Sequence, residues 1–212
     1  MVDIILRLNI RYFYGEVPEW LNGPLSKSGR PLRVSRVQIP PSPNSIFTMK
    51  LYRFSPIENQ DQLLQAIKYT HFVCHELCRK ILYKYLFNFG NIGIFCHYDQ
   101  EYELLTKISE ELTDSTGSFN QKYFRLHQPM VIPAEGNVPE TTYTHLYIRR
   151  PDSAKPQVGD VDFFLEPAEY AKLKNQSNLK GVRPLNRPDL DLIGLHDPDI
   201  DALAYVGTHK LN

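Results

Sequence analysis

The chain has 212 residues, with 24 Lys and Arg against 24 Asp and Glu, so its formal net charge at pH 7 is zero. A chain without a net positive field is not expected to bind nucleic acid or an anionic membrane surface. Its sequence has no apolar run near the roughly 20 residues that span a bilayer, and its three cysteines, without an export signal, indicate reduced thiols in the cytoplasm.

Residues 1–48 differ in composition from the rest of the chain. From Gly15 on, six prolines interrupt them and no hydrophobic period persists, so no element longer than a short strand is expected there. The segments GEVPEWLNG, from Gly15, and RVQIP, from Arg36, can be encoded by DNA that resembles two conserved parts of a serine tRNA gene. Two interpretations follow: a spurious leader translated from such a gene, or a genuine, disordered proline-rich arm. In both, one α/β domain is predicted over 49–212, beginning at Met49.

A long helix is the first large element predicted in the domain. A short strand over 50–54 precedes it, and Ser55, Pro56 and Glu58 have the order of a capping box with proline in the first turn. The helix is predicted over 58–86 because apolar residues recur there at the helical period. They form one core-facing stripe of Leu63, Ile67, Thr70, Cys74, Cys78, Ile81 and Tyr85.

The remainder of the domain shows a strand, helix, strand, strand order twice. The first occurrence comprises a strand over 92–98, a helix over 99–112 and strands over 122–132 and 141–150. The second comprises a strand over 158–165, a helix over 167–174 and short strands around 182, over 189–195 and over 202–207. The predicted fold class is therefore α/β (α+β), with a mixed or antiparallel sheet from two βαβββ-like modules plus a long N-terminal helix.

This order, with Asp197-Pro-Asp-Ile-Asp201 before the last strand, resembles the paired modules of the vicinal oxygen chelate, or glyoxalase-like, superfamily. The resemblance implies a divalent metal held by four side chains on the first and last strands of each module. The positions that it implies in this chain are His97, His145, Asp160 or Asp162, and Tyr205, which stands where a glutamate is usual. The domain also resembles a bacterial protein family, and that resemblance implies no activity.

Three cysteines and a histidine form a candidate zinc site. Cys74 and Cys78 lie one helical turn apart, and Cys96 and His97 on the next strand complete a set of thiolate and imidazole ligands of the kind that zinc takes. The alternative is that Cys74 and Cys78, at the centre of the apolar stripe, pack as small buried hydrophobic side chains. The sequence permits both.

The aspartates of the second half have a functional and a structural explanation. Five of them between 189 and 201, with His196 among them, offer oxygens to a hard cation or a division of acid and base roles. The same residues suit turns and the solvated face of a strand. Asp160 and Asp162 alternate along a predicted strand, so beside His145 they form either a cleft site or a solvated sheet face.

The sequence contains no P-loop, dinucleotide-binding glycine pattern, nucleophile elbow or HExxH motif. The first functional hypothesis is therefore a non-catalytic cytoplasmic binding or interaction protein. Its protein partner, or a second copy in a homo-oligomer, would cover Tyr69, Phe72 and Tyr83 on the far side of the long helix. The alternative is a glyoxalase-like small-molecule or divalent-metal enzyme that acts through His145 and the strand aspartates. Neither hypothesis requires a cofactor, although a divalent metal suits the second.

Overall fold

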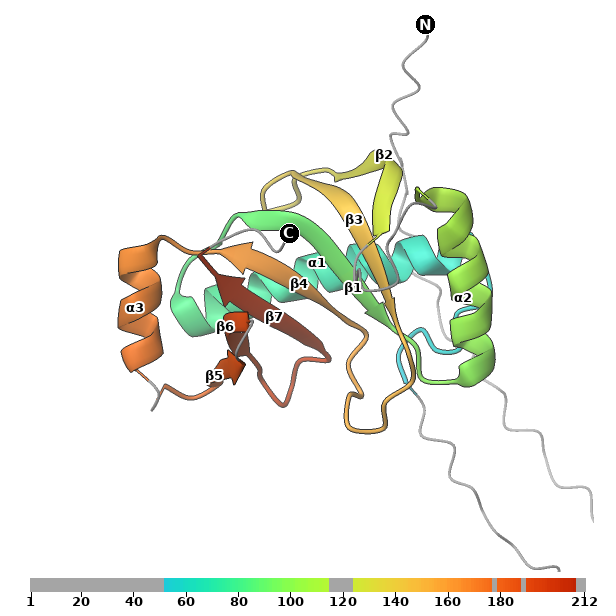
Figure 1. Cartoon of the computed structure of the whole chain (residues 1–212). Helices are drawn as coiled ribbons and strands as arrows, with labels where there is room; N and C mark the ends of the chain where they lie inside the picture. The colour runs from blue at the N-terminus through green and yellow to red at the C-terminus, as the bar shows by residue number, and fades with distance from the viewer. Residues whose placement is uncertain (1–51, 115–123, 177–178, 188–189, 209–212) are drawn as a thin grey trace, which may run out of the picture. The chain divides into compact units, whose positions relative to one another are not determined.

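The computed structural model describes residues 52–114, 124–176, 179–187 and 190–208, which belong to the unit Lys50–Asn212. The predicted leader, residues 1–48, lies outside them. The described elements follow in the order α1, β1, α2, β2, β3, β4, α3, β5, β6, β7 (Figure 1).

The strands form one mixed sheet in the order β2-β3-β1-β4-β7-β6-β5. Their bounds are Asn88–Phe95 (β1), Phe124–Ile132 (β2), Thr141–Arg149 (β3), Gly159–Phe164 (β4), Val182–Arg187 (β5), Leu190–Leu195 (β6) and Ala202–Gly207 (β7). β1 pairs in parallel with β3, and β4 pairs in parallel with β7, whereas β1 and β4 run antiparallel beside each other. Two modules, β1-α2-β2-β3 and β4-α3-β5-β6-β7, therefore meet along β1 and β4. The predicted fold class is confirmed, although the first module has three strands among the described residues.

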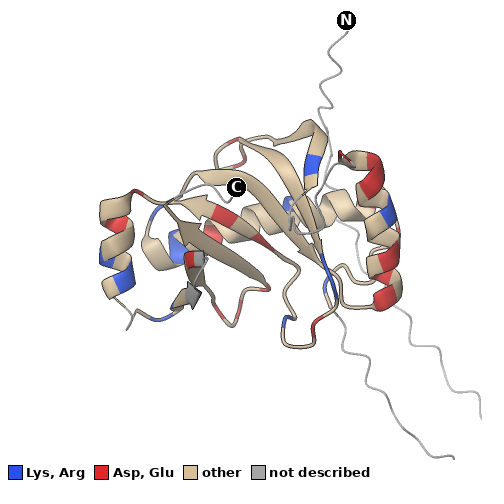
Figure 2. Ribbon diagram, in the orientation of Figure 1, with Lys and Arg blue, Asp and Glu red and all other residues tan. Residues whose placement is uncertain are grey.

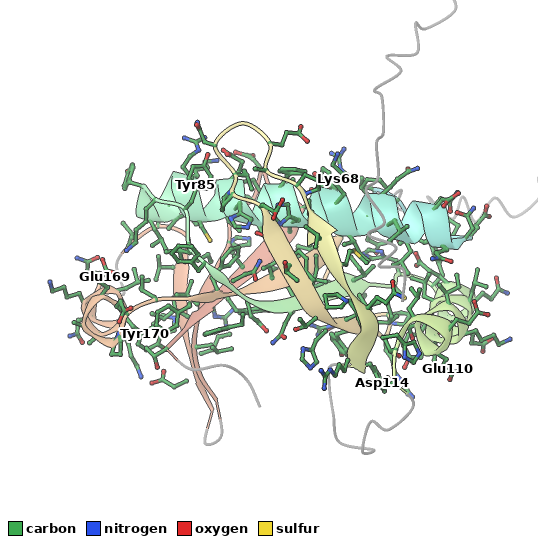
Figure 3. All side chains as sticks on the ribbon, turned by 90° about the horizontal axis from the view of Figure 1, so that it is seen from above. Lys68, Tyr85, Glu110, Asp114, Glu169 and Tyr170 are labelled. Carbon is green, nitrogen blue, oxygen red and sulfur yellow. The ribbon has the colours of Figure 1, made fainter. Side chains whose placement is uncertain are left out.

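The hydrophobic core lies on one side of this sheet. α1 (Gln60–Leu82) contacts β7, β4 and β1 there, and α2 (Asp99–Leu112) and α3 (Pro167–Asn175) lie toward the two ends of the sheet (Figure 3). Side chains of the central strands that point toward α1 are fully buried, among them Ile92, Val161 and Phe163. No described helix covers the opposite side, which carries Gly93, Tyr147, Asp160, Asp162 and Tyr205 and which we call the helix-free face.

α1 is held to the sheet by the stripe that the sequence predicts. Six of its seven members, Leu63, Ile67, Thr70, Cys74, Cys78 and Ile81, are buried at 8% exposure or less, whereas Tyr85 lies beyond the end of α1 and is only partly buried. The helix is shorter than the predicted 58–86, because Asn59 caps it by accepting a hydrogen bond from the Gln62 N–H, and Tyr83 ends it in the left-handed conformation with φ of 57°. The predicted cap, Ser55, is used elsewhere. Among the described helices, none combines the length and the apolar character that crossing a membrane requires.

One predicted strand is absent from the described residues, and the strand predicted over 92–98 is displaced along the chain. The strand predicted over 50–54 is wrong for its described residues, 52–54, which form no strand. β1 begins at Asn88, four residues before the predicted start, because Gly90 adopts φ of 82° and the pairing with β4 shifts register between Asn88 and Ile92. On β2, Pro129 lies within a similar register shift, at the edge of the sheet where a missing N–H is tolerated.

Candidate functional site

Two buried aspartates lie at the centre of the helix-free face. Side chains alternate along β4, so Val161 and Phe163 point toward α1, where Phe163 meets the His75 ring, and Asp160 and Asp162 point the other way. Figure 2 shows the acidic positions of β4 in the middle of the sheet. Both aspartates are only 1% exposed.

Gly93 provides the space that the Asp160 carboxylate occupies. The two residues are partners across the β1–β4 pairing, and a Cβ atom added to Gly93 would overlap the Asp160 Oδ1. The same added atom would lie 3.4 Å from the Tyr147 ring, so the carboxylate and this ring are neighbours. Burial first, and the Asp160 charge to a smaller extent, raise the pKa of Tyr147. The Tyr147 hydroxyl therefore keeps its proton at neutral pH and can donate a hydrogen bond.

A second row of polar residues crosses the same face beside the first. Asp162 is the register partner of Tyr205 on β7, and Asn91 on β1 is the partner of His145 on β3. On the antiparallel strands β1 and β4, Asn91 precedes Ile92 and Asp162 follows Val161, so both lie on the same side of the Ile92–Val161 pair. The His145 Nδ1 lies 2.9 Å from the Thr144 hydroxyl, an arrangement that fixes the ring. Four strands thus contribute one polar side chain each to this row.

The charges on this face are unevenly distributed. Asp160 and Asp162 are two residues apart on one strand, so their Cα atoms are about 7 Å apart. Two carboxylates at that separation repel each other by roughly 2 kcal/mol at an effective dielectric constant of about 20. Arg149, two residues beyond Tyr147 on β3, forms an ion pair of 3.1 Å with Asp152, and Lys155 interacts electrostatically with Asp160.

The structure brings three of the predicted candidates, His145, Asp160 and Asp162, to one face of the sheet, and Tyr205 lies beside them. It does not bring His97 there, because β1 ends at Phe95 and His97 lies beyond the sheet. β1 contributes Asn91 instead, a residue that the sequence analysis missed because it placed the start of the strand at Ile92. Gly90 was the available signal, since an isolated glycine within an apolar strand often marks a bulge.

The four-ligand metal site implied by the glyoxalase-like resemblance does not fit these residues. Two of its four positions hold Asn91 and Tyr205, and within the described ranges no group of three or more His, Cys, Asp or Glu side chains is arranged to hold a metal ion. We therefore derive no chemical step through a metal.

The candidate zinc site is not assembled either. Cys74 and Cys78 are 0% exposed between α1 and the sheet, where the Cys74 thiol donates to the Leu203 carbonyl at 3.1 Å. Burial raises the pKa of both thiols, which disfavours the thiolates that zinc needs. Burial also raises the pKa of Cys96, whose N–H bonds to the Arg149 carbonyl at the end of β1. These cysteines pack as hydrophobic side chains.

His97, itself partly buried, belongs to a polar cluster with the buried Ser55 and Glu101. Its Nδ1 lies 2.7 Å from the Ser55 hydroxyl, which donates to Glu101 Oε1 at 2.8 Å, and its N–H donates to Glu101 Oε2 at 2.7 Å. Glu101 also accepts from the Ile57 N–H. The carboxylate bonds to the serine rather than to the histidine ring, and Ser55 is 7% exposed, so this is not a nucleophile with an oriented base. The cluster fixes the segment before α1 to the start of α2.

The aspartates near the C-terminus serve turns and surface ion pairs, as the structural interpretation predicts. Asp189 lies outside the described residues, and the exposed turn residue Asp199 donates its N–H to the Asp197 side chain. The remaining contacts are those of Asp191 with Lys174 at 2.8 Å, Asp197 with Lys80 at 2.7 Å, and Asp201 with Arg53 at 2.7 Å and with the Tyr69 hydroxyl. His196 is exposed among them.

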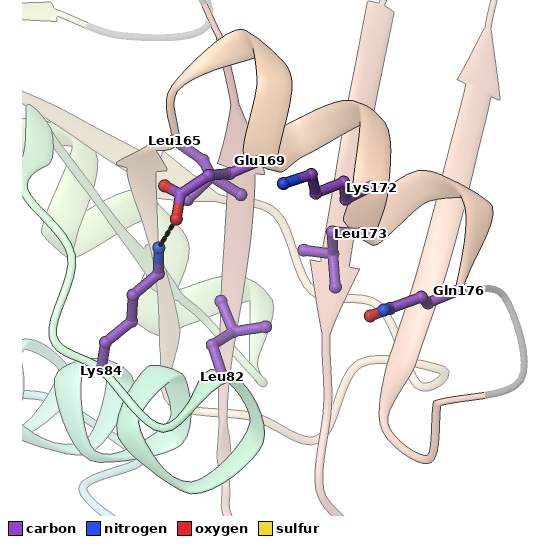
Figure 4. Close-up of a pocket in the computed structure, with 7 residues that line it drawn as sticks. All are labelled: Leu82, Lys84, Leu165, Glu169, Lys172, Leu173 and Gln176. Atoms are coloured by element: carbon purple, nitrogen blue, oxygen red, sulfur yellow. Dashed lines mark hydrogen bonds and ion pairs between the residues drawn. The ribbon is translucent and has the colours of Figure 1, made fainter.

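A shallow concavity lies between the end of α1 and α3, away from these aspartates. It has a volume of about 200 Å³ and a floor formed by Leu82, Leu165 and Leu173 (Figure 4). Lys84 and Glu169 close one side with an ion pair of 2.8 Å. The hollow is shallow, and its charged groups already bind each other, so it is a weaker candidate than the helix-free face.

The fold and the site together define an α+β protein in which two modules share one mixed sheet and a pair of buried aspartates lies on its helix-free face. No protein-family model and no curated protein sequence matches the chain. Among solved structures, it is similar to a variant of Streptomyces coelicolor methylmalonyl-CoA epimerase in complex with 2-nitronate-propionyl-CoA, at 16% identity and a TM-score of 0.27, over 58% of this chain and 99% of that one. A methylmalonyl-CoA epimerase in complex with methylmalonyl-CoA and NH4+ is similar at 18% identity and a TM-score of 0.29, over 59% and 97%. Scores this low carry no argument about function.

Proposed function

We propose that this chain is a glyoxalase-like protein that binds a small molecule on the helix-free face, and that the carboxylates of Asp160 and Asp162 act on this ligand. The observation that supports this most directly is the pair of buried carboxylates at the centre of a sheet face that no described helix covers. Gly93 adds to it, because a side chain there would occupy the space of the Asp160 carboxylate. Structural aspartates on a sheet surface do not need such space.

The residues around the aspartate pair supply the remaining roles. Two carboxylates in different surroundings can divide the work, one accepting a proton from the ligand and the other holding a polar group. Asp160 lies beside the Tyr147 ring and Asp162 beside Tyr205, so their surroundings differ. His145 lies in the row of Asp162 and provides a third proton-exchanging group. The reaction class that this set supports is proton transfer on a small polar molecule.

Isosteric substitutions test the proposal in the full chain. Asp160→Asn and Asp162→Asn keep the shape of each side chain and remove its charge, and Asp199→Asn, in an exposed turn, is the matched control. The measurement is thermal stabilisation by a panel of small amines, carboxylic acids, aldehydes and hydroxyketones. We expect a compound that stabilises the wild type and Asp199→Asn and fails with either site variant. Equal stabilisation of all four proteins would place the ligand elsewhere and contradict the proposal.

A second candidate function, a protein interaction, is supported by two exposed aromatic rings. The far side of α1 is less open than the sequence suggests, because Tyr69 and Phe72 are partly buried against the core. Tyr83 and Phe87, just after α1, are 88% and 81% exposed. If a protein partner or a second copy covers these rings, the double variant Tyr83→Ser/Phe87→Ser should no longer bind it. Light scattering that finds a monomer at every concentration would count against a second copy.

A further inference from the structure

Two histidines lie in the interface between α1 and the sheet, on the side opposite the aspartates. His71 and His75 are both 0% exposed, and their ring centroids are 4.6 Å apart. The His71 Nδ1 meets the Tyr143 hydroxyl at 2.9 Å. Among the described residues, the His71 Nε2 and both ring nitrogens of His75 have no hydrogen-bond partner. The sequence predicts no role for either imidazole, and the proposed function does not use them.

The surroundings of this pair disfavour a positive charge. The titratable and charged groups around it are Lys68, Cys74, Glu76 and Cys78 on α1, Tyr143 on β3, Tyr85 after α1, and, on the other side of β4, Asp160 and Asp162. Glu76 is already bound to Arg79 and Tyr85 at the surface. No carboxylate among the described residues accepts a hydrogen bond from either ring.

Both rings are therefore neutral when α1 is docked. Burial first, then His75 and Lys68, lower the pKa of His71 from 6.5 to about 3, and burial lowers that of His75 to about 4. In an undocked helix each ring returns to an ordinary pKa near 6.5. The docked state is thus fully favoured above pH 6.5, and protonation favours the undocked state increasingly as the pH falls from 6.5 toward 4.

We propose that the docking of α1 on the sheet is an acid-sensitive switch, in which protonation of His71 and His75 releases the helix while the sheet remains folded. β4 connects the switch to the helix-free face, because Val161 and Phe163 lie against α1 and the aspartates point from the same strand to the other side. Acid release therefore loosens the strand that carries Asp160 and Asp162. This inference does not depend on the proposed ligand-binding function.

Hydrogen exchange of the full chain, read by mass spectrometry at pH 7.5 and 5.0 and corrected for the intrinsic rate, tests the switch. At pH 5.0 the protonation of each histidine shifts the equilibrium between docked and undocked α1 by about 30-fold toward the undocked state. The protection of α1 peptides from hydrogen exchange should therefore fall by about 1000-fold. Peptides of β1, β4 and β7 should lose less. Equal loss in α1 and in these strands would show global unfolding and overturn the proposal, as would unchanged protection of α1.

The variant His75→Leu separates the histidine effect from a general effect of acid. The leucine side chain suits the contact with Phe163 and cannot be protonated. At pH 5.0 the protection of α1 in this variant should therefore be about 30-fold higher than in the wild type. The control is His196→Gln, at an exposed position, which should behave like the wild type. Loss in His75→Leu as large as in the wild type would overturn the proposal. If His75→Leu does not fold, the two-pH comparison of wild-type peptides decides by itself.

Discussion

The fit between Gly93 and Asp160 gives the most direct test of the site geometry. In Gly93→Ala the new methyl group would overlap the Asp160 Oδ1, lie 3.2 Å from its Cγ and lie 3.4 Å from the Tyr147 ring. The carboxylate would have to move by about 1 Å to reach an ordinary van der Waals distance. Crowding of this kind in a packed region costs about 1–3 kcal/mol, and the smaller entropy of the unfolded alanine chain offsets about 0.4–1 kcal/mol. We expect a net loss of about 1–2 kcal/mol in the free energy of unfolding.

Gly194→Ala is the matched control, because it lies in β6 of the same sheet and its added methyl group meets no atom closer than 3.5 Å. That variant should be as stable as the wild type or slightly more stable. Urea denaturation at neutral pH measures both free energies, provided that the slope against denaturant is unchanged. If Gly93→Ala proves as stable as Gly194→Ala, the Asp160 carboxylate does not occupy the space above Gly93, and the geometry of the site must be revised.

Three further substitutions probe contacts away from Asp160 and Asp162. Tyr143→Phe removes the hydrogen-bond partner of the His71 Nδ1 and should lower the free energy of unfolding, measured by urea denaturation, by about 1–3 kcal/mol. Adding His71→Leu should recover much of this loss, because no buried nitrogen is then left without that partner. Glu101→Gln replaces one oxygen of a carboxylate that accepts three hydrogen bonds, so it should cost about 2 kcal/mol and speed hydrogen exchange over 52–59. Arg53→Ala breaks an ion pair whose arginine side chain is 57% exposed, and its thermal midpoint should fall by the equivalent of less than about 1 kcal/mol.

The sequence predicts those features that depend on local periodicity. The stripe of α1 and the order of the elements follow from the spacing of apolar residues, because a helix face and an alternating strand each leave a pattern within one segment. The polar row on the helix-free face depends on the register between strands, which no single segment contains. Asn91 shows this well, since its place beside His145 follows from a bulge at Gly90 and from a parallel pairing with β3.

The cysteines and histidines of α1 illustrate a second limit of sequence reasoning. His71, Cys74, His75 and Cys78 have the spacing of a ligand set, and the same spacing is that of a helix face that packs on a sheet. Burial decides between the two, because it disfavours both the thiolates that a metal needs and the charged imidazoles. That information lies in the tertiary contacts of α1 with β4 and β7.

The single seam between the two modules has a consequence for how this chain can be divided. The halves share one antiparallel strand pair, β1 with β4, and α1 spans that seam by contacting both of these strands and β7. A polypeptide severed in the loop between β3 and β4 would keep each half of the sheet whole. Two fragments coexpressed from such a split gene should associate, because α1 contacts both halves of the sheet. The same fragments without α1 should not form a stable complex.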